Sequence, residues 1–261
     1  MIYTFVSKTD PGRARENNED SVAHDPATHL GVLADGMGGY NAGEVASGMA
    51  TAFIKSEMAR WLSEAGKQAN SRDVRRALEI CVDNANRSVF NAASANSQYS
   101  GMGTTLVVAV FRDAKVLLGH IGDSRCYRLR GGEMVQITKD HSLLQEQIDA
   151  GLLTVEQAAT SSHKNLVTRA LGVEDAVMLE INEHAVESGD LYLMCSDGLS
   201  DMVNDAEIET ILGLQANMAQ KADRLIALAN ELGGRDNISV LLVQAGAADK
   251  RRGLLSRLLR K

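Results

Sequence analysis

The sequence lacks a long apolar run: none of its stretches approaches the roughly 20 apolar residues that a membrane-spanning helix needs. Its beginning, MIYTFVSKTDPGR, also lacks the extended apolar segment of a signal peptide. The 261 residues are 44% hydrophobic and 23% charged, which is typical of a soluble globular protein with a sizeable core. We therefore expect a cytoplasmic protein.

Cysteine is scarce, and linker-like composition is absent. Cys81, Cys126 and Cys195 are far apart in sequence, and none belongs to a CxxC pair. Zinc or redox chemistry at cysteine is therefore disfavoured, and we expect reduced structural thiols. No internal repeat and no Pro-rich or Ser-rich linker divides the chain.

An overall excess of positive charge is missing too, since the formal net charge is −7. Nucleic-acid binders use clustered cations to displace counterions from phosphates, so we expect no nucleic-acid partner. The charge is uneven, however, because the last twelve residues carry six cations and no acid, which leaves −13 on residues 1–249. The cations of this end are Lys250, Arg251, Arg252, Arg257, Arg260 and Lys261.

Residues 247–261 are expected to form a basic amphipathic tail. If its final part is helical, Leu254, Leu255, Leu258 and Leu259 share one face. Such a segment could bind an anionic membrane surface, an acidic partner or the acidic body of its own chain. A disordered tail is the alternative, because about twelve residues form only a marginal helix in water.

Periodicity predicts blocks of helix and blocks of strand rather than a regular βαβ alternation. Helices are expected at about 41–62, capped by Asn41, at 72–95, capped by Ser71, and at 141–150, 205–212 and 218–232. Strands are expected within 104–138, with a two-residue hairpin turn at Gly131-Gly132, and in the runs DLYLMCS and ISVLLVQ. A short helix is expected at Thr154–Gln157, and the polar stretch 159–165 is expected to be a surface loop.

Four aspartates lie next to apolar, strand-like segments of the sequence. Asp35 in VLADGMGG and Asp197 in LMCSDGL are each expected to end an apolar strand, Asp236 in RDNISV precedes one, and Asp20 in NNEDSV precedes Val22. Each Asp-Gly pair alone is most simply a turn. Acids at strand ends can instead converge on one rim of a sheet, where they repel one another unless cations are present.

The ligand type predicts which cation would bind. Oxygen ligands without cysteine or paired histidine favour hard octahedral ions such as Mg²⁺ or Mn²⁺. Glycine after Asp35 and Asp197 lets the backbone approach an ion closely. Competing chemistries lack their motifs, because the sequence has no G-x-S-x-G elbow, no G-x-x-x-x-G-K-[ST] phosphate loop and no H-E-x-x-H zinc helix.

An ordered series of motifs runs along the chain: Arg15 with Asn18-Glu19-Asp20, ADGMGGYNAGEVAS from Ala34, GMGTTL from Gly101, GDSRCYRLR from Gly122, TKDHSL from Thr138, TRALG from Thr168, SDGLSD from Ser196 and RDNISV from Arg235. Over about residues 8–244, this series resembles the bacterial type-2C, metal-dependent serine/threonine protein phosphatases of the PPM family. Each motif alone is weak, but the whole series in the family's order is specific. The resemblance makes residues 1–246 a PPM-type phosphatase domain.

The resemblance implies an α+β fold, a four-layer α-β-β-α sandwich with a central antiparallel β-sandwich flanked by helices. It implies two Mn²⁺ or Mg²⁺ ions that share a hydroxide, which hydrolyses phosphoserine or phosphothreonine on proteins. Asp35 would bridge both ions, and the Gly36 carbonyl, Asp20, Asp197 and Asp236 would supply further oxygens. Glu19 would hold water bound to an ion, and Asn237 would stand behind the ligands.

Two residues have an implied role and a simpler alternative, and a third departs from the family pattern. Arg15 corresponds to the family arginine that binds the substrate phosphate, although a surface ion pair is the simpler role. Asp123 corresponds to a ligand for a weaker third ion, and its simpler role is a turn. Met37 stands where eukaryotic members carry the histidine proposed as general acid, so the proton donor must be another group.

The resemblance also implies partners and alternatives. We expect a monomer whose partners are phosphorylated proteins, namely the targets of a bacterial Ser/Thr kinase and the kinase itself. Residues 159–165 resemble the family's variable flap beside the cleft. A hydrolase of small phosphate esters and a phosphoprotein-binding pseudophosphatase remain the alternatives, and the second is disfavoured because every metal-binding acid is present.

Overall fold

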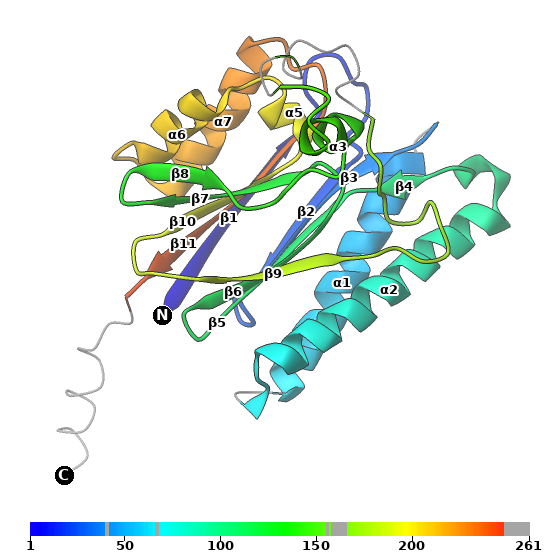
Figure 1. Cartoon of the computed structure of the whole chain (residues 1–261), viewed down its shortest axis with the longest axis horizontal. Helices are drawn as coiled ribbons and strands as arrows, with labels where there is room; N and C mark the ends of the chain where they lie inside the picture. The colour runs from blue at the N-terminus through cyan, green and yellow to red at the C-terminus, as the bar shows by residue number, and fades with distance from the viewer. Residues whose placement is uncertain (40–41, 66–67, 155–156, 158–165, 248–261) are drawn as a thin grey trace.

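Two antiparallel sheets pack face to face between two layers of helices (Figure 1). The structure is a computed structural model that describes residues 1–39, 42–65, 68–154, 157 and 166–247. The five-stranded sheet has the order β1 (Ile2–Asp10), β11 (Ile238–Gly246), β10 (Leu191–Cys195), β7 (Arg125–Arg130) and β8 (Glu133–Gln136). The six-stranded sheet has the order β2 (Asp20–Asp25), β3 (Leu30–Met37), β5 (Leu106–Arg112), β6 (Lys115–Ile121) and β9 (Glu180–Ala185), with β4 (Gly103–Thr104) paired to β3.

Helices cover the outer face of each sheet. The six-stranded sheet carries α1 (Ala42–Ala65) and α2 (Ser71–Ala95), and the five-stranded sheet carries α5 (Asp197–Ser200), α6 (Asp205–Gly213) and α7 (Met218–Glu231). The short helices η2 (Ser97–Tyr99) and α3 (Leu143–Asp149) lie in connections. The predicted four-layer α-β-β-α sandwich is confirmed.

The interior has three apolar clusters, which correspond to the three interfaces between layers. Leu30 and Val32 of β3 face α1 and α2, whereas Leu33 of the same strand faces the opposite sheet. On the other side, Leu193 of β10 faces α6 and α7. The central strands are therefore buried on both faces, which explains why they read as continuous apolar runs rather than as alternating ones.

Local signals predicted several element ends correctly. Gly131 and Gly132 have φ of 60° and 90° and join β7 to β8, as a two-residue hairpin requires. Gly151, at φ 69°, follows the last residues of α3. The second helix is capped by Asn70 rather than by Ser71, because the Asn70 side chain accepts from the backbone N–H of Asp73 and the Asp73 carboxylate accepts in return.

Other expectations need correction or lie outside the described residues. The helix at 141–150 begins at Leu143, because Ser142 serves as its N-cap. Thr154 and Gln157 exchange the two hydrogen bonds of a helix start. The cap at Asn41, the loop at 159–165 and the tail from 248 onward lie outside the described residues, and the domain boundary at 246 stays a prediction.

The thiols and helices agree with the compositional expectations. Cys81, Cys126 and Cys195 are all buried and unpaired, and burial raises the pKa of Cys81 to about 12. Within the described ranges, no helix combines the length and apolar character needed to cross a membrane.

Candidate metal centre

Strand pairing places two of the predicted acids side by side. Asp20, the first residue of β2, lies directly opposite Asp35 of β3 in the antiparallel register. The Asp35 backbone is held on its other side, where its N–H donates to Thr105 Oγ1 at 3.0 Å. Cross-strand neighbours project from the same face of a sheet, so the two carboxyl groups point to the same region.

The expectation that Asp35 ends its strand is wrong. Strand β3 continues through Gly36 and Met37, because these two residues pair with Thr104 and Gly103 of β4. Asp35 therefore lies within the strand, paired with Asp20 on one side and hydrogen-bonded to Thr105 on the other, which restricts the direction of its side chain.

The other two acids come from the opposite sheet. Asp197 begins α5 just after β10, and Asp236 lies two residues before β11, which is the neighbour of β10. Ser196 connects the two sheets, since its hydroxyl donates to Asp20 Oδ2 at 2.7 Å and accepts from the N–H of Ser239 at 2.9 Å. The predicted acids Asp20, Asp35, Asp197 and Asp236 therefore meet at one end of the β-sandwich.

Burial makes this cluster electrostatically costly. Desolvation, the largest cause, raises the pKa of Asp20 to about 7, and it raises the pKa values of Asp35 and Asp197 well above their usual range. Repulsion from neighbouring carboxylates adds to each increase. Among the described residues, Asp20 Oδ1 and Asp197 Oδ1 are buried and have no hydrogen-bond partner. Buried carboxylate oxygens that lack partners fit the requirements of a hard divalent cation.

Asp123 joins the same cluster from the turn after β6. Its carboxyl raises the pKa values of both Asp35 and Asp197. Its own pKa is raised to about 6, first by burial and then by repulsion from Asp140. The turn is held in place because Thr105 Oγ1 lies 2.8 Å from the hydroxyl of Ser124.

Two glycines have a structural role that the sequence analysis described only in general terms. A Cβ at Gly36 would lie 2.1 Å from the carbonyl oxygen of Gly43, at the start of α1. A Cβ at Gly198 would lie 2.0 Å from the carbonyl oxygen of Asn237. Both positions need glycine because one backbone packs directly on another next to the acids.

Asn237 is joined by three hydrogen bonds to the segment 11–19 behind the acids. Its side-chain amide donates to the carbonyl oxygens of Pro11 and Asn17, and its Oδ1 accepts from the N–H of Glu19 at 2.7 Å. The carbonyl oxygen of Glu19 in turn accepts from Gly36 N–H. The pKa of the Glu19 side chain is raised mainly by burial, with a counteracting effect of Arg15.

Arg15 lies at the open side of the cluster. One guanidinium nitrogen donates to Asp236 Oδ2 at 2.7 Å, while 52% of the Arg15 side chain stays exposed. This ion pair matches the simpler role considered for Arg15, yet its partner is one of the candidate ligands. The guanidinium is therefore adjacent to the cluster and accessible to an anion from solvent.

A further group of titratable residues was missed by sequence analysis. His120, His141 and Glu180 place one nitrogen or oxygen each within 4.8 Å of one another. His120 comes from β6, His141 from the segment before α3 and Glu180 from β9. The signal available was the histidine in TKDHSL, but its neighbours are 21 and 39 residues away and strand β9 was not predicted.

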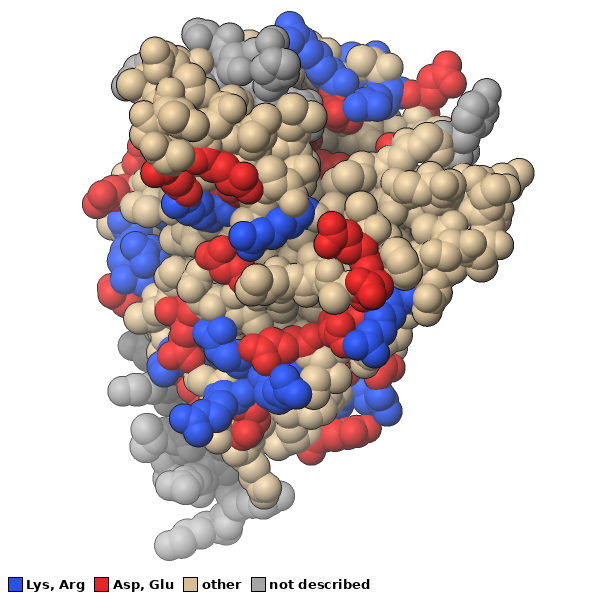
Figure 2. All heavy atoms as spheres, turned by 45° about the vertical axis from the view of Figure 1, so that its right-hand side comes forward, with Lys and Arg blue, Asp and Glu red and all other residues tan. Residues whose placement is uncertain are grey.

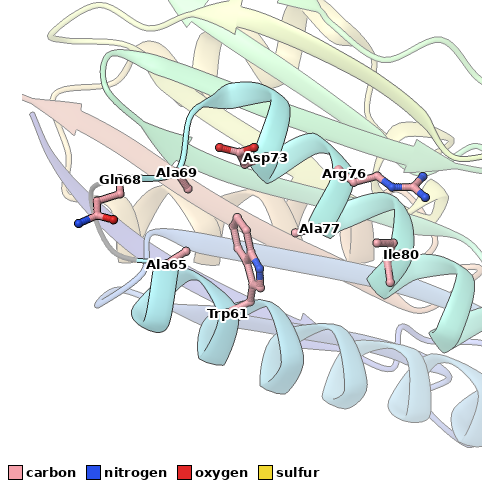
Figure 3. Close-up of a pocket in the computed structure, with 8 residues that line it drawn as sticks. All are labelled: Trp61, Ala65, Gln68, Ala69, Asp73, Arg76, Ala77 and Ile80. Carbon is pink, nitrogen blue, oxygen red and sulfur yellow. The ribbon is translucent and has the colours of Figure 1, made fainter.

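The hollow between α1 and α2 is separate from these groups. It has a volume of about 460 Å³ and is lined mostly by apolar side chains, including Trp61, Ala77 and Ile80. Figure 3 shows Trp61 rising from α1 into the space beside Ala77 of α2. None of the clustered acids lines this hollow, so the acid cluster is the candidate functional site.

Acidic and basic side chains are interspersed over the lower half of the face in Figure 2, without a continuous acidic field. The negative charge relevant to a metal is therefore the buried cluster, whose members lie far apart in sequence.

Comparison with known proteins agrees with this geometry. The family model described as Protein phosphatase 2C matches residues 12–233. A serine/threonine phosphatase, Stp, of Listeria innocua is 38% identical over 252 residues, which cover 94% of this chain and 97% of the relative. The crystal structure of the Mycobacterium tuberculosis serine/threonine phosphatase PstP/Ppp is 37% identical with a TM-score of 0.86, and the match covers 95% of this chain and 100% of that one.

A further solved structure bears on the metal. The catalytic domain of the phosphatase PstP in complex with two manganese ions is 36% identical, with a TM-score of 0.81, over 94% of this chain and 99% of that one. The family suggested by the ordered motifs is thus confirmed. The chain belongs to the protein phosphatase 2C family, the PPM family of serine/threonine protein phosphatases.

Proposed function

We propose that this protein hydrolyses phosphoserine and phosphothreonine on other proteins with two Mn²⁺ or Mg²⁺ ions, and so reverses a bacterial Ser/Thr kinase. The observation that carries the proposal is the buried acid cluster, in which Asp20 Oδ1 and Asp197 Oδ1 have no hydrogen-bond partner within the described part of the chain. Carboxylates with raised pKa values are costly to ionise together unless cations accompany them. Asp35, Asp20, Asp197, Asp236 and the Gly36 carbonyl would hold the two ions, and Asp123 would hold a weaker third.

The ions would supply a water nucleophile of lowered pKa and would neutralise charge on the phosphate. The chain's own residues would bind the phosphate and orient water. Arg15 would donate to a phosphate oxygen, and its half-exposed guanidinium next to Asp236 supports this role. Its planar fork of donors suits phosphate geometry. Glu19, held through its backbone by Asn237, would orient water next to the ions.

The proton donor to the leaving alcohol is not supplied by residue 37. Met37 ends β3, and its side chain lies beside Gly103, where a Cβ would be 3.6 Å from the Met37 Cγ. A thioether carries no dissociable proton. We propose that water within the site, or the substrate itself, provides the proton.

Metal removal tests the proposal most directly. Activity on a phosphothreonine peptide should fall to background in excess EDTA and return when Mn²⁺ exceeds the chelator. Titration calorimetry on the metal-free protein should show at least two Mn²⁺ ions bound. Full activity in EDTA would overturn the two-metal proposal.

The substrate class needs a separate comparison. A panel of phosphoserine peptides, phosphothreonine peptides and small phosphate esters should show higher kcat/KM on the peptides. In cells, a deletion strain and a strain carrying Asp35→Asn should accumulate the same phosphorylated sites. Sites that accumulate only in the deletion strain would point to a binding role and contradict the catalytic one.

A further inference from the structure

The group formed by His120, His141 and Glu180 lies next to the turn that carries Asp123. His141 pairs with Gly122 at two points: its backbone N–H donates to Gly122 O at 2.9 Å, and its Nδ1 accepts from Gly122 N–H at 3.1 Å. The imidazole is only 7% exposed and stacks on His120, with ring centroids 4.6 Å apart. A buried aromatic ring therefore closes one side of the Gly122–Ser124 turn.

The hydrogen bonds assign the tautomer of His141. Because Nδ1 accepts an N–H, the proton of the neutral ring must be on Nε2. Nε2 lies 3.3 Å from Glu180 Oε2, which accepts that proton in a hydrogen bond. The carboxylate of Glu180 is also held by Asn182, whose amide donates to Oε1 at 3.0 Å. Glu180 thus orients the ring so that Nδ1 faces Gly122.

A metal ion is a poorer explanation of the same group. Arg169 places a guanidinium nitrogen 3.4 Å from His141 Nε2, so a divalent cation there would meet a fixed positive charge. The Nε2 atom of His120 already faces the Lys139 carbonyl at 2.8 Å. The nitrogens of the group are engaged in hydrogen bonds within the protein, which favours a positioning role.

We propose that His141 is a positioning residue that holds the Gly122–Ser124 turn, so that Asp123 faces Asp35 and Asp197, and that Glu180 keeps its imidazole in the required tautomer. The opposite side of the turn is held by Thr105, whose hydroxyl contacts Ser124 and accepts from Asp35 N–H. The turn is therefore fixed between His141 and the strand region that carries Asp35. This inference rests on the proposed role of Asp123 as a ligand for the weaker ion.

The contacts predict how variants differ. His141→Ala removes the acceptor for Gly122 N–H, and we expect about 10-fold weaker binding of the weaker Mn²⁺ ion, as is usual when a residue behind a metal ligand is lost. His141→Asn should restore part of this affinity, because its Oδ1 can accept from Gly122. His184→Ala, on the same strand as Glu180, is the matched control and should bind Mn²⁺ as the unmodified protein does.

The experiment combines calorimetric Mn²⁺ titration with a double-mutant cycle. His141→Ala should lower kcat about 10-fold alone but less than about 2-fold when added to Asp123→Ala, because both changes then act through one group. Equal effects in the two backgrounds, or an unchanged affinity for the weaker ion, would overturn the inference. An unmodified enzyme that is inactive in Mn²⁺ would instead overturn the proposed function.

A spectroscopic measurement on the unmodified protein tests the inference even if the variants do not fold. ¹⁵N NMR of the unmodified, metal-free protein should show His141 with its proton on Nε2 and with an unprotonated Nδ1. A proton on Nδ1 would contradict the hydrogen bond from Gly122 and overturn the proposal without any substitution.

Discussion

Asp35 has the most constrained position of the clustered acids. It pairs with Asp20 across the ladder, its backbone is held by Thr104 and Thr105, and its pKa is raised well above the usual range by burial and by three neighbouring carboxyls. An amide in its place would keep the shape but lose the negative charge that binds a cation.

We therefore expect Asp35→Asn to lower kcat by at least about 100-fold, more than is typical for residues behind a metal ligand. Kinetics on a small aryl phosphate and calorimetric Mn²⁺ titration would measure this. Asp223→Asn, at a surface ion pair with Lys8, serves as the control and should change neither quantity. Unchanged Mn²⁺ binding in Asp35→Asn would show that this residue is not a ligand.

Arg15 should affect substrate binding more than turnover. Its guanidinium is half-exposed and donates to Asp236, a candidate ligand, so its loss should remove a phosphate-binding donor while leaving the candidate ligands in place. Arg15→Ala should raise KM about 10-fold with a smaller change in kcat, and Arg15→Lys should give an intermediate KM. Steady-state kinetics would decide, and an unchanged KM in Arg15→Ala would contradict phosphate binding.

At the scale of elements, the junction between α5 and β11 depends on Gly198. A Cβ there would overlap the Asn237 carbonyl, which is backbone and cannot rotate away. We expect Gly198→Ala to lower the free energy of unfolding by about 1–3 kcal/mol, the usual cost of overpacking. Urea unfolding of the metal-free protein would measure the change without contributions from bound ions.

Gly48, in the middle of α1, provides the matched control for this substitution. A Cβ at Gly48 meets nothing within 4 Å, so Gly48→Ala should raise the free energy of unfolding by up to about 1 kcal/mol through helix propensity. If the two alanine variants had equal stability, the close backbone approach at Gly198 would not matter energetically.

For the whole molecule, the acid cluster links stability to pH and metal. The pKa of Asp20 rises from 3.8 in the unfolded chain to about 7 in the folded, metal-free protein. The folded state therefore retains a proton that the unfolded chain releases near pH 4. The resulting stabilisation is complete below about pH 4 and is lost as pH rises to about 7.

Between pH 5 and pH 8, we expect the titration of Asp20 to lower the free energy of unfolding of the metal-free protein by on the order of a few kcal/mol. His24, His29, His141 and His184 have lowered pKa values and oppose the trend, so the comparison needs Asp20→Asn, which cannot titrate there. Urea unfolding in EDTA should show that the free energy of unfolding of Asp20→Asn increases relative to that of the unmodified protein as pH rises. Excess Mn²⁺ at pH 8 should restabilise the unmodified protein, and a constant difference between the two proteins would refute the assignment.

Much of the fold and site was accessible from the sequence because the signals are local. The two glycines of the β7–β8 hairpin must adopt positive φ, and apolar runs between turn residues indicate buried strands. The order of the acid motifs indicated the family and the residues that would meet. Strand β9 was missed because EINEHA shows little apolar alternation, and β6 is its one partner strand among the described residues.

The family, the layered fold class and the acids of the candidate site could be predicted from residue type and order along the chain. The way in which the acids are held depends on contacts between distant segments. Ser196 reaches Asp20 across 176 positions and Asn237 reaches Glu19 across 218, so no local pattern could encode either bond. The same holds for His141, whose role depends on Gly122 and Glu180. These contacts form only when two sheets pack and bring distant segments within hydrogen-bond distance.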